Sequence, residues 1–135
     1  MKYLKAISEL LCNSPVGEIN GYSDEAQARK DMFARIGKKA MKELAQLLGL
    51  TTFKVSFNPA GIAVSGDLTL IGMFDDHVGI YVSINHEMTG LEVLYRTVRH
   101  MKDYSGGVNR WMYYRDLANE DKLFSTMGLL RNKAA

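Results

Sequence analysis

The spacing of the apolar residues changes at Gly49, and this change restricts the possible folds more than any other feature of the sequence. Over residues 4–11 and 33–48, apolar side chains recur every three or four positions, which places them on one face of a helix. Beyond residue 52 they recur at every second position, which places them on one face of a strand. We therefore expect helices in the first part of the chain and strands after them.

Two helices are predicted before the change in spacing. The first covers residues 2–11 and ends before the helix-breaking residues at 13–15. The second follows Ser23, whose hydroxyl suits a helix N-cap, and ends at Gly49, because glycine readily takes the left-handed conformation of a C-cap. The residues expected on its buried face are Phe33, Ile36, Ala40, Leu44, Leu47 and Leu48.

Four strands are predicted between residues 53 and 98. Alternation of apolar and polar side chains indicates strands at 53–57 and 62–70, and the most regular alternation, at 78–84, indicates a central strand. This central strand sends Gly79, Tyr81 and Ser83 to the face opposite its apolar residues. The fourth strand, at 91–98, carries apolar residues on both faces, so its sequence does not identify the buried one.

A closing helix is predicted after Asn119, which can cap it, with Glu120 and Asp121 in its first turn. Its apolar stripe consists of Leu123, Phe124, Met127 and Leu130. A chain of 135 residues suits a single domain, 1–135, around one core. We expect an α+β fold: a two-layer sandwich with N-terminal helices, a roughly four-stranded antiparallel meander and a C-terminal helix, the helices lying on one sheet face.

The cysteine and histidine content excludes a zinc finger and any intramolecular disulfide. Cys12 is the single cysteine, and only three histidines accompany it. Residues 1–13 lack the continuous apolar run of a signal peptide, and no stretch is long and apolar enough to span a membrane. We therefore expect a cytoplasmic protein with no membrane partner and no cofactor.

The segment 95–115 differs from the rest of the chain in its charge and its aromatic content. It holds five of the thirteen aromatic residues and five basic residues against one acid, whereas the whole chain has a net charge of only +2. Basic residues argue for phosphate contact when they are clustered, as they are here. The candidate partner-binding residues are Arg96, Arg99, Lys102, Tyr104, Ser105, Gly106, Gly107, Asn109, Arg110, Trp111, Tyr113, Tyr114 and Arg115.

Cations and rings around a flexible turn can bind a nucleic acid or anchor a protein partner, and the sequence does not separate these two uses. Backbone N–H groups at 105–107 can form a nest for a phosphate or a carboxylate, with Lys102 and Arg110 on either side. Alternatively, Trp111 and two of the tyrosines only cover the end of the core.

From this segment we predict a small non-enzymatic binding or inhibitor module that acts through the basic and aromatic face at residues 95–115. Its partner is a protein or a nucleic acid, and self-association into a homo-oligomer stays open. The small size and the lack of a catalytic motif would suit an accessory protein of a phage or a plasmid.

The alternative is a metal-dependent enzyme. In an antiparallel meander the fourth strand runs back to the turn at 75–77, so His100 would lie near that turn. The site would consist of Asp75, Asp76, His77 and His100, a set that suits zinc, iron(II) or manganese. His86 cannot join it, because a whole strand of roughly 25–30 Å separates it from His77. An acidic turn is more often a solvated surface, so we predict no metal and no catalytic residue.

Overall fold

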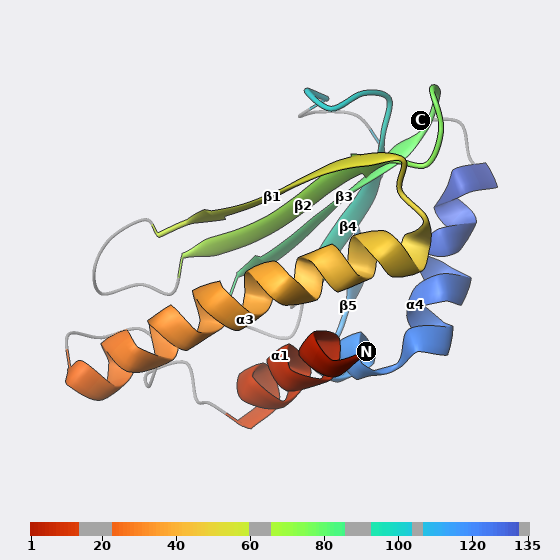
Figure 1. Cartoon of the computed structure of the whole chain (residues 1–135). Coiled ribbons are helices and arrows are strands. Elements are labelled where there is room, and N and C mark those ends of the chain that lie inside the picture. Colours follow the sequence, from red (N-terminus) through yellow and green to blue (C-terminus); the bar gives the residue numbers. More distant parts are fainter. Residues whose placement is uncertain (14–22, 60–65, 86–92, 104–106, 133–135) are drawn as a thin grey trace.

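The computed structural model describes residues 1–13, 23–59, 66–85, 93–103 and 107–132. Helices come first, strands follow, and further helices close the chain (Figure 1). The elements are α1 (Lys2–Asn13), α3 (Asp24–Leu48), β1 (Thr52–Asn58), β2 (Asp67–Met73), β3 (Gly79–Asn85), β4 (Val93–Val98), β5 (Arg110–Met112), the 3-10 helix η1 (Tyr114–Ala118), α4 (Glu120–Thr126) and the 3-10 helix η2 (Gly128–Asn132). Parts of the predicted second and fourth strands, at 62–65 and 91–92, lie outside the described residues.

The strands form one antiparallel sheet of five in the order β1-β2-β3-β4-β5, so each strand pairs with its neighbour in the chain. This confirms the α+β class and the meander, with five strands where about four were expected. The additional strand is β5, whose three residues pair with Val93, Leu94 and Tyr95 of β4. Three residues are too few to show an apolar period, so the prediction left them in an irregular connection.

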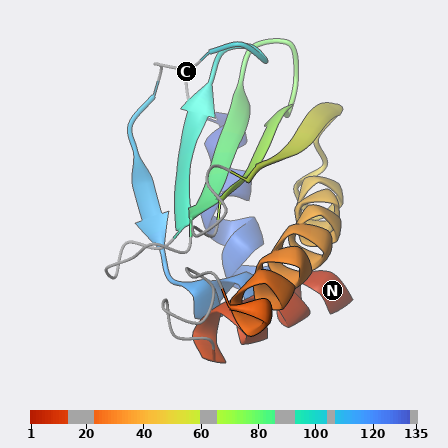
Figure 2. The ribbon, with the colours of Figure 1, turned by 90° about the vertical axis from the view of Figure 1, so that its left-hand side faces the viewer.

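The helices cover one face of this sheet. In Figure 1, α3 crosses in front of the strands with α1 beside it, and Figure 2 shows the same layers from the left-hand side of that view. α3 packs on β1 and β2, whereas α1 packs on α3 and η1. Alternation turns Leu70, Ile80 and Val82 toward the helices, and all three are fully buried. None of the described helices combines the length and the apolar character that crossing a bilayer requires.

Three predicted helix ends are confirmed by their hydrogen bonds. Ser23 Oγ accepts a hydrogen bond from Ala26 N at 3.1 Å and begins α3. Gly49 ends α3 in the left-handed conformation, with φ of 69°. Asn119 Oδ1 accepts a hydrogen bond from Lys122 N at 3.0 Å and begins α4.

The predicted end of the first helix is wrong, because α1 continues to Asn13. The closing helix is shorter than expected, since α4 ends at Thr126 before a separate 3-10 helix, and Phe124 of its expected apolar stripe is exposed.

The face of α3 that packs on the core is the predicted one. Phe33, Ala40, Leu44 and Leu48 are buried, and Ile36 and Leu47 pack against the same core at partial burial. On another side of α3, Glu43 Oε1 accepts hydrogen bonds from Tyr3 N and Leu4 N, each at 2.8 Å. A carboxylate of α3 therefore caps the first turn of α1 and fixes the two helices together.

Strand register assigns the two faces of β4, which the sequence did not. Tyr95 pairs with Val82, so it lies on the helix side of the sheet, and it is 8% exposed. Arg96 lies on the opposite face, yet it is only 7% exposed and donates a hydrogen bond to Asp103 O. The chain after β4 therefore turns back over this opposite face, which explains why both faces of β4 are apolar.

Gly107→Ala should destabilise the fold more than Gly49→Ala. Both glycines have positive φ, 79° and 69°, which costs an alanine about 1 kcal/mol. A Cβ on Gly107 would also lie 2.5 Å from Thr97 O, whereas a Cβ on Gly49 meets nothing within 4 Å. We expect urea unfolding to give losses of about 1 kcal/mol for Gly49→Ala and at least about 2 kcal/mol for Gly107→Ala. Equal losses would contradict the close approach of residue 107 to β4.

Candidate functional site

The candidate contact surface is the outer face of the sheet, which we define as the face opposite α1 and α3. The strand register aligns the outward side chains in rows that run across the strands. One row consists of Lys54, Ile71, Tyr81 and Arg96. The next row consists of Ser56, Thr69, Ser83, Leu94 and Trp111.

A buried carboxylate, Asp103, fixes the turn that follows β4. Asp103 is 3% exposed, and its Oδ2 accepts hydrogen bonds from Arg99 N at 3.0 Å and Arg99 Nε at 3.1 Å. Arg96 donates a hydrogen bond to Asp103 O at 3.2 Å. This turn, teal at the top of Figure 1, brings Met101 and Lys102 to the outer face. Arg96 and Asp103 therefore serve to position the turn.

A pocket of about 230 Å³ lies between this turn and the sheet. It is lined by Lys54, Ser56, Thr69, Ile71, Tyr81, Met101 and Lys102. Ser56 Oγ and Thr69 Oγ1 are hydrogen-bonded at 2.6 Å, and the Arg96 guanidinium lies over the Tyr81 ring, 4.8 Å from its centroid. The lining of the pocket thus combines two lysines, two hydroxyl residues and an aromatic ring with the apolar side chains of Ile71 and Met101.

Six of the seven lining residues were not predicted as site residues, and five of these six belong to β1, β2 and β3. The sequence carried one signal for them, because polar positions such as Lys54, Ser56 and Tyr81 in alternating strands must face away from the core. It carried no signal that the turn after β4 would fold over these positions. That arrangement depends on tertiary contacts of Asp103, which no local pattern encodes.

Two large aromatic side chains of the predicted segment are exposed. Trp111 pairs with Leu94 on the outer face and is 44% exposed, and Tyr113 is 48% exposed. The backbone at Tyr113 is extended, with φ −88° and ψ 158°, so its side chain points to the same side as that of Trp111. The Arg115 guanidinium lies over the Tyr113 ring, 4.6 Å from its centroid. These three residues continue the outer face beyond the pocket.

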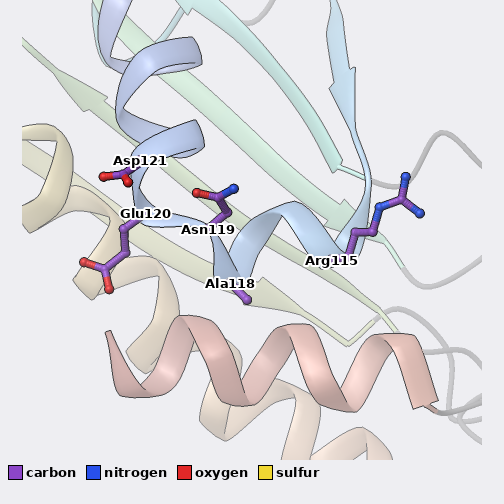
Figure 3. A pocket seen from close by; sticks show the side chains of 5 residues that line it. All are labelled: Arg115, Ala118, Asn119, Glu120 and Asp121. Carbon is purple, nitrogen blue, oxygen red and sulfur yellow. The ribbon is translucent and has the colours of Figure 1, made fainter.

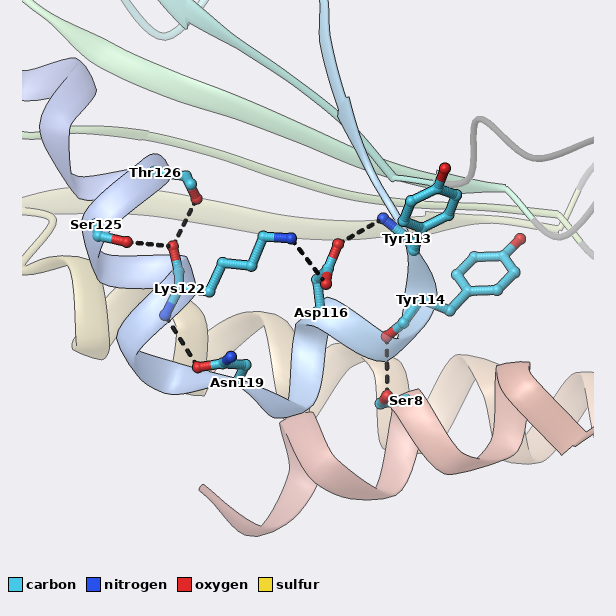
Figure 4. Close-up of polar contacts among 8 residues, drawn as sticks. All are labelled: Ser8, Tyr113, Tyr114, Asp116, Asn119, Lys122, Ser125 and Thr126. Carbon is cyan, nitrogen blue, oxygen red and sulfur yellow. Dashed lines mark hydrogen bonds and ion pairs between the residues drawn. The ribbon is translucent and has the colours of Figure 1, made fainter.

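Three other predicted site residues add no exposed side chain to this face. Tyr114 is 6% exposed, and its backbone O accepts a hydrogen bond from Ser8 Oγ at 2.8 Å (Figure 4). Arg110 pairs with Tyr95 on the helix side of the sheet, and its buried Nε finds no hydrogen-bond partner among the described residues. Arg96 is enclosed beneath the turn after β4. The segment 95–115 is therefore divided between the interior and the surface.

The structure describes some of the remaining predicted site residues and not others. Arg99 and Lys102 are exposed on the turn, and Gly107 and Asn109 are exposed between the turn and β5. Tyr104, Ser105 and Gly106 lie outside the described residues, as does His86. The anion-binding nest at 105–107 stays a prediction.

The residues of the metal alternative do not form a ligand group. Asp75 Oδ1 accepts hydrogen bonds from His77 N at 2.7 Å and Val78 N at 2.9 Å, which close the turn and lower the pKa of Asp75. His100 Nδ1 accepts a hydrogen bond from Lys102 N at 3.2 Å. Within the described part of the chain, no three His, Cys, Asp or Glu side chains are grouped as metal ligands would be.

A larger pocket of about 610 Å³ lies at the start of α4 and is lined by Arg115, Ala118, Asn119, Glu120 and Asp121 (Figure 3). Figure 3 shows the Arg115 side chain directed away from the two carboxylates. Glu120 pairs with the terminal amino group of Met1, and Asn119 caps α4. These polar groups hold the N-terminus and α4 in place, and we assign no binding site to this pocket.

Asp116 joins the exposed end of the segment to α4 (Figure 4). Its Oδ2 accepts a hydrogen bond from Tyr113 N at 2.9 Å, and its Oδ1 pairs with Lys122 Nζ at 3.0 Å. Burial acts to raise the pKa of Asp116, but the hydrogen bond from Tyr113 and the ion pair with Lys122 outweigh it, and Arg115 adds to them. The pKa of Asp116 is therefore below its usual value, and the ionised carboxylate stabilises the fold.

No protein-family model, no curated protein and no solved structure matches this chain. Its function therefore has to be inferred from its own residues.

Asp116→Asn should lower the free energy of unfolding at neutral pH by about 1–2 kcal/mol, because the amide still accepts from Tyr113 N but loses the ion pair. Since the folded-state pKa of Asp116 is lowered, its contribution is fully present above the ordinary value of 3.8 and is lost as the pH falls through the folded-state pKa. Urea unfolding across this range should show the wild type and the variant converging in acid. If the difference in the free energy of unfolding between the wild type and the variant stayed constant into strong acid, the stabilising role of the ionised Asp116 carboxylate would be contradicted.

Proposed function

We propose that this chain is a small, non-enzymatic binding module whose contact surface is the outer face of the sheet. The observation that carries this proposal is the exposure of Trp111 and Tyr113 on the same side of the sheet as the pocket beneath Lys102. Large aromatic side chains with a polar edge are enriched where proteins contact partners, because they bury much area at a small cost in side-chain entropy.

The exposure of these rings favours contact over a purely structural role. A ring that only closes the core is enclosed by its neighbours, as Tyr114 is at 6% exposure. Trp111 and Tyr113 keep nearly half of their surfaces in solvent. Contiguous exposed apolar surface is uncommon on monomeric proteins and is a mark of interaction sites, which favours a contact role for these two neighbouring rings.

The proposal includes an inhibitor role, in which this face covers a working site of the partner, and it suits an accessory protein of a phage or a plasmid. We also propose the cytoplasm as the place of action. Cys12, the single cysteine, is an exposed thiol, and thiols persist in a reducing compartment. The metal-dependent alternative is not pursued, because its candidate residues are not grouped as ligands.

Trp111→Ala should reduce capture of the partner from a lysate of the native host at least about tenfold, which corresponds to a loss of about 1.4 kcal/mol. The matched control is Phe124→Ala, which removes another exposed ring, 52% exposed on α4, and should leave capture unchanged. Capture is measured with tagged wild type and both variants at equal concentration. Equal retention by Trp111→Ala and Phe124→Ala would overturn the assignment of the contact surface.

A further inference from the structure

We infer that the partner of the outer face is a single-stranded nucleic acid. This inference rests on the proposed function and adds the chemical class of the ligand. Phosphate groups would lie at the pocket beneath the turn after β4, and bases would stack on Trp111 and Tyr113.

The distribution of charge on this face suits a polyanion. Lys54 and Lys102 line the pocket, and Arg115 lies at the other end of the face, over the Tyr113 ring. Asp103, the acid next to the lining residue Lys102 in the chain, is buried and already bound to Arg99. Among the described strand residues whose register places them on the outer face, Asp67 is the one carboxylate. Cations therefore outnumber acids where a ligand would lie.

The pocket presents the donors that phosphate oxygens accept. Ammonium and hydroxyl groups are the usual protein partners of the nucleic-acid backbone. Lys54, Lys102, Ser56 and Thr69 supply these groups within one pocket of about 230 Å³. That volume is small for a whole nucleotide, so we expect one backbone phosphate there, with its base outside.

The exposed rings lie where neighbouring bases can reach them. Trp111 and Tyr113 are two residues apart in extended chain, so about 6–7 Å separates their Cα atoms. Stacking on an aromatic ring requires the face of a base, which a duplex keeps inside its stack and a single strand leaves open. The geometry therefore favours a single strand over a duplex.

The composition of this face argues against a protein partner. The centre of a protein interface is depleted in Lys and Ser, because these groups are costly to remove from water. Here Ser56, Thr69 and Ser83 form a row of hydroxyls across three strands, with Lys54 beside it. The hydroxyl and ammonium groups of such a row stay hydrogen-bonded when they face water or a phosphate, because both offer several acceptor atoms.

The binding experiment uses the single tryptophan of the chain as its reporter. A single strand of about twelve mixed nucleotides is titrated into the full chain, and Trp111 emission is recorded together with the anisotropy of a dye on the oligonucleotide. We expect quenching of Trp111 with a dissociation constant in the range of about 1–100 μM near physiological salt. Quenching and anisotropy should give the same affinity.

A pair of matched variants locates the phosphate contacts. Lys54→Gln with Lys102→Gln should weaken binding about tenfold and reduce the salt slope, log affinity against log salt, by about 1.4, since each contact to a single strand contributes about 0.7. Lys5→Gln with Lys42→Gln removes two exposed lysines from α1 and α3 and should change neither quantity. Equal effects of the two double variants would overturn the inference.

Two further outcomes decide between classes of partner. A duplex of the same length that binds as tightly as the single strand would overturn the assignment to single strands. If no oligonucleotide quenches Trp111, yet capture from a nuclease-treated lysate still depends on Trp111, the partner is a protein: this inference fails and the proposed function stands. If capture does not depend on Trp111 either, both fail.

Discussion

The burial of one sheet face beneath α3 is the interaction on which the rest of the structure depends. Leu44 and Leu48 of α3 and Leu68 and Leu70 of β2 are fully buried in one core, and each contributes about 1.5–3 kcal/mol by leaving water. Gly37 permits this packing, since a Cβ there would lie 2.5 Å from Leu68 Cδ2, so a residue that weakens the helix allows the close approach of the sheet. Successive side chains of a strand point to opposite faces of the sheet, so strands that place their apolar side chains against α3 place their polar side chains on the other face. The row of hydroxyl groups on the outer face is a consequence of this alternation.

The turn after β4 folds over this polar face and forms one wall of the pocket on it. Burying the Asp103 carboxylate is costly unless it is paired and hydrogen-bonded, and Arg99 supplies both contacts while it remains 59% exposed in its side chain. Arg96 is held between the Tyr81 ring and Asp103 O. Two of the five cations of the segment 95–115 therefore stabilise the turn, and a third, Arg110, points to the helix side. The cations left for a ligand are Lys102 and Arg115, joined by Lys54 from β1.

Local signals in the sequence predicted most of the elements, although not β5 or η1, whereas the position of the site depends on tertiary contacts. Ser23, Gly49 and Asn119 were recognised as helix ends because a cap depends on the residue and its immediate neighbours. The alternation at 78–84 identified β3 because a strand with one buried face imposes a period of two. By contrast, nothing local distinguishes Trp111 from Tyr114, three positions later, although one faces solvent and the other the core. Their orientations follow from the pairing of β5 with β4 and from the hydrogen bond of Ser8 to Tyr114, and both contacts join residues that are distant in sequence.

The measurement that tests the central claim most directly is a map of amide chemical shifts during titration with a short single-stranded oligonucleotide. It reports every described strand and helix at once and needs no substitution. If the outer face binds nucleic acid, the largest shifts fall on Lys54, Thr69, Tyr81, Lys102 and Trp111, and the amides of α1 and α3 stay unchanged. Shifts centred on α1 or α3, or none at all up to about millimolar oligonucleotide, where even weak non-specific binding saturates, would contradict the account.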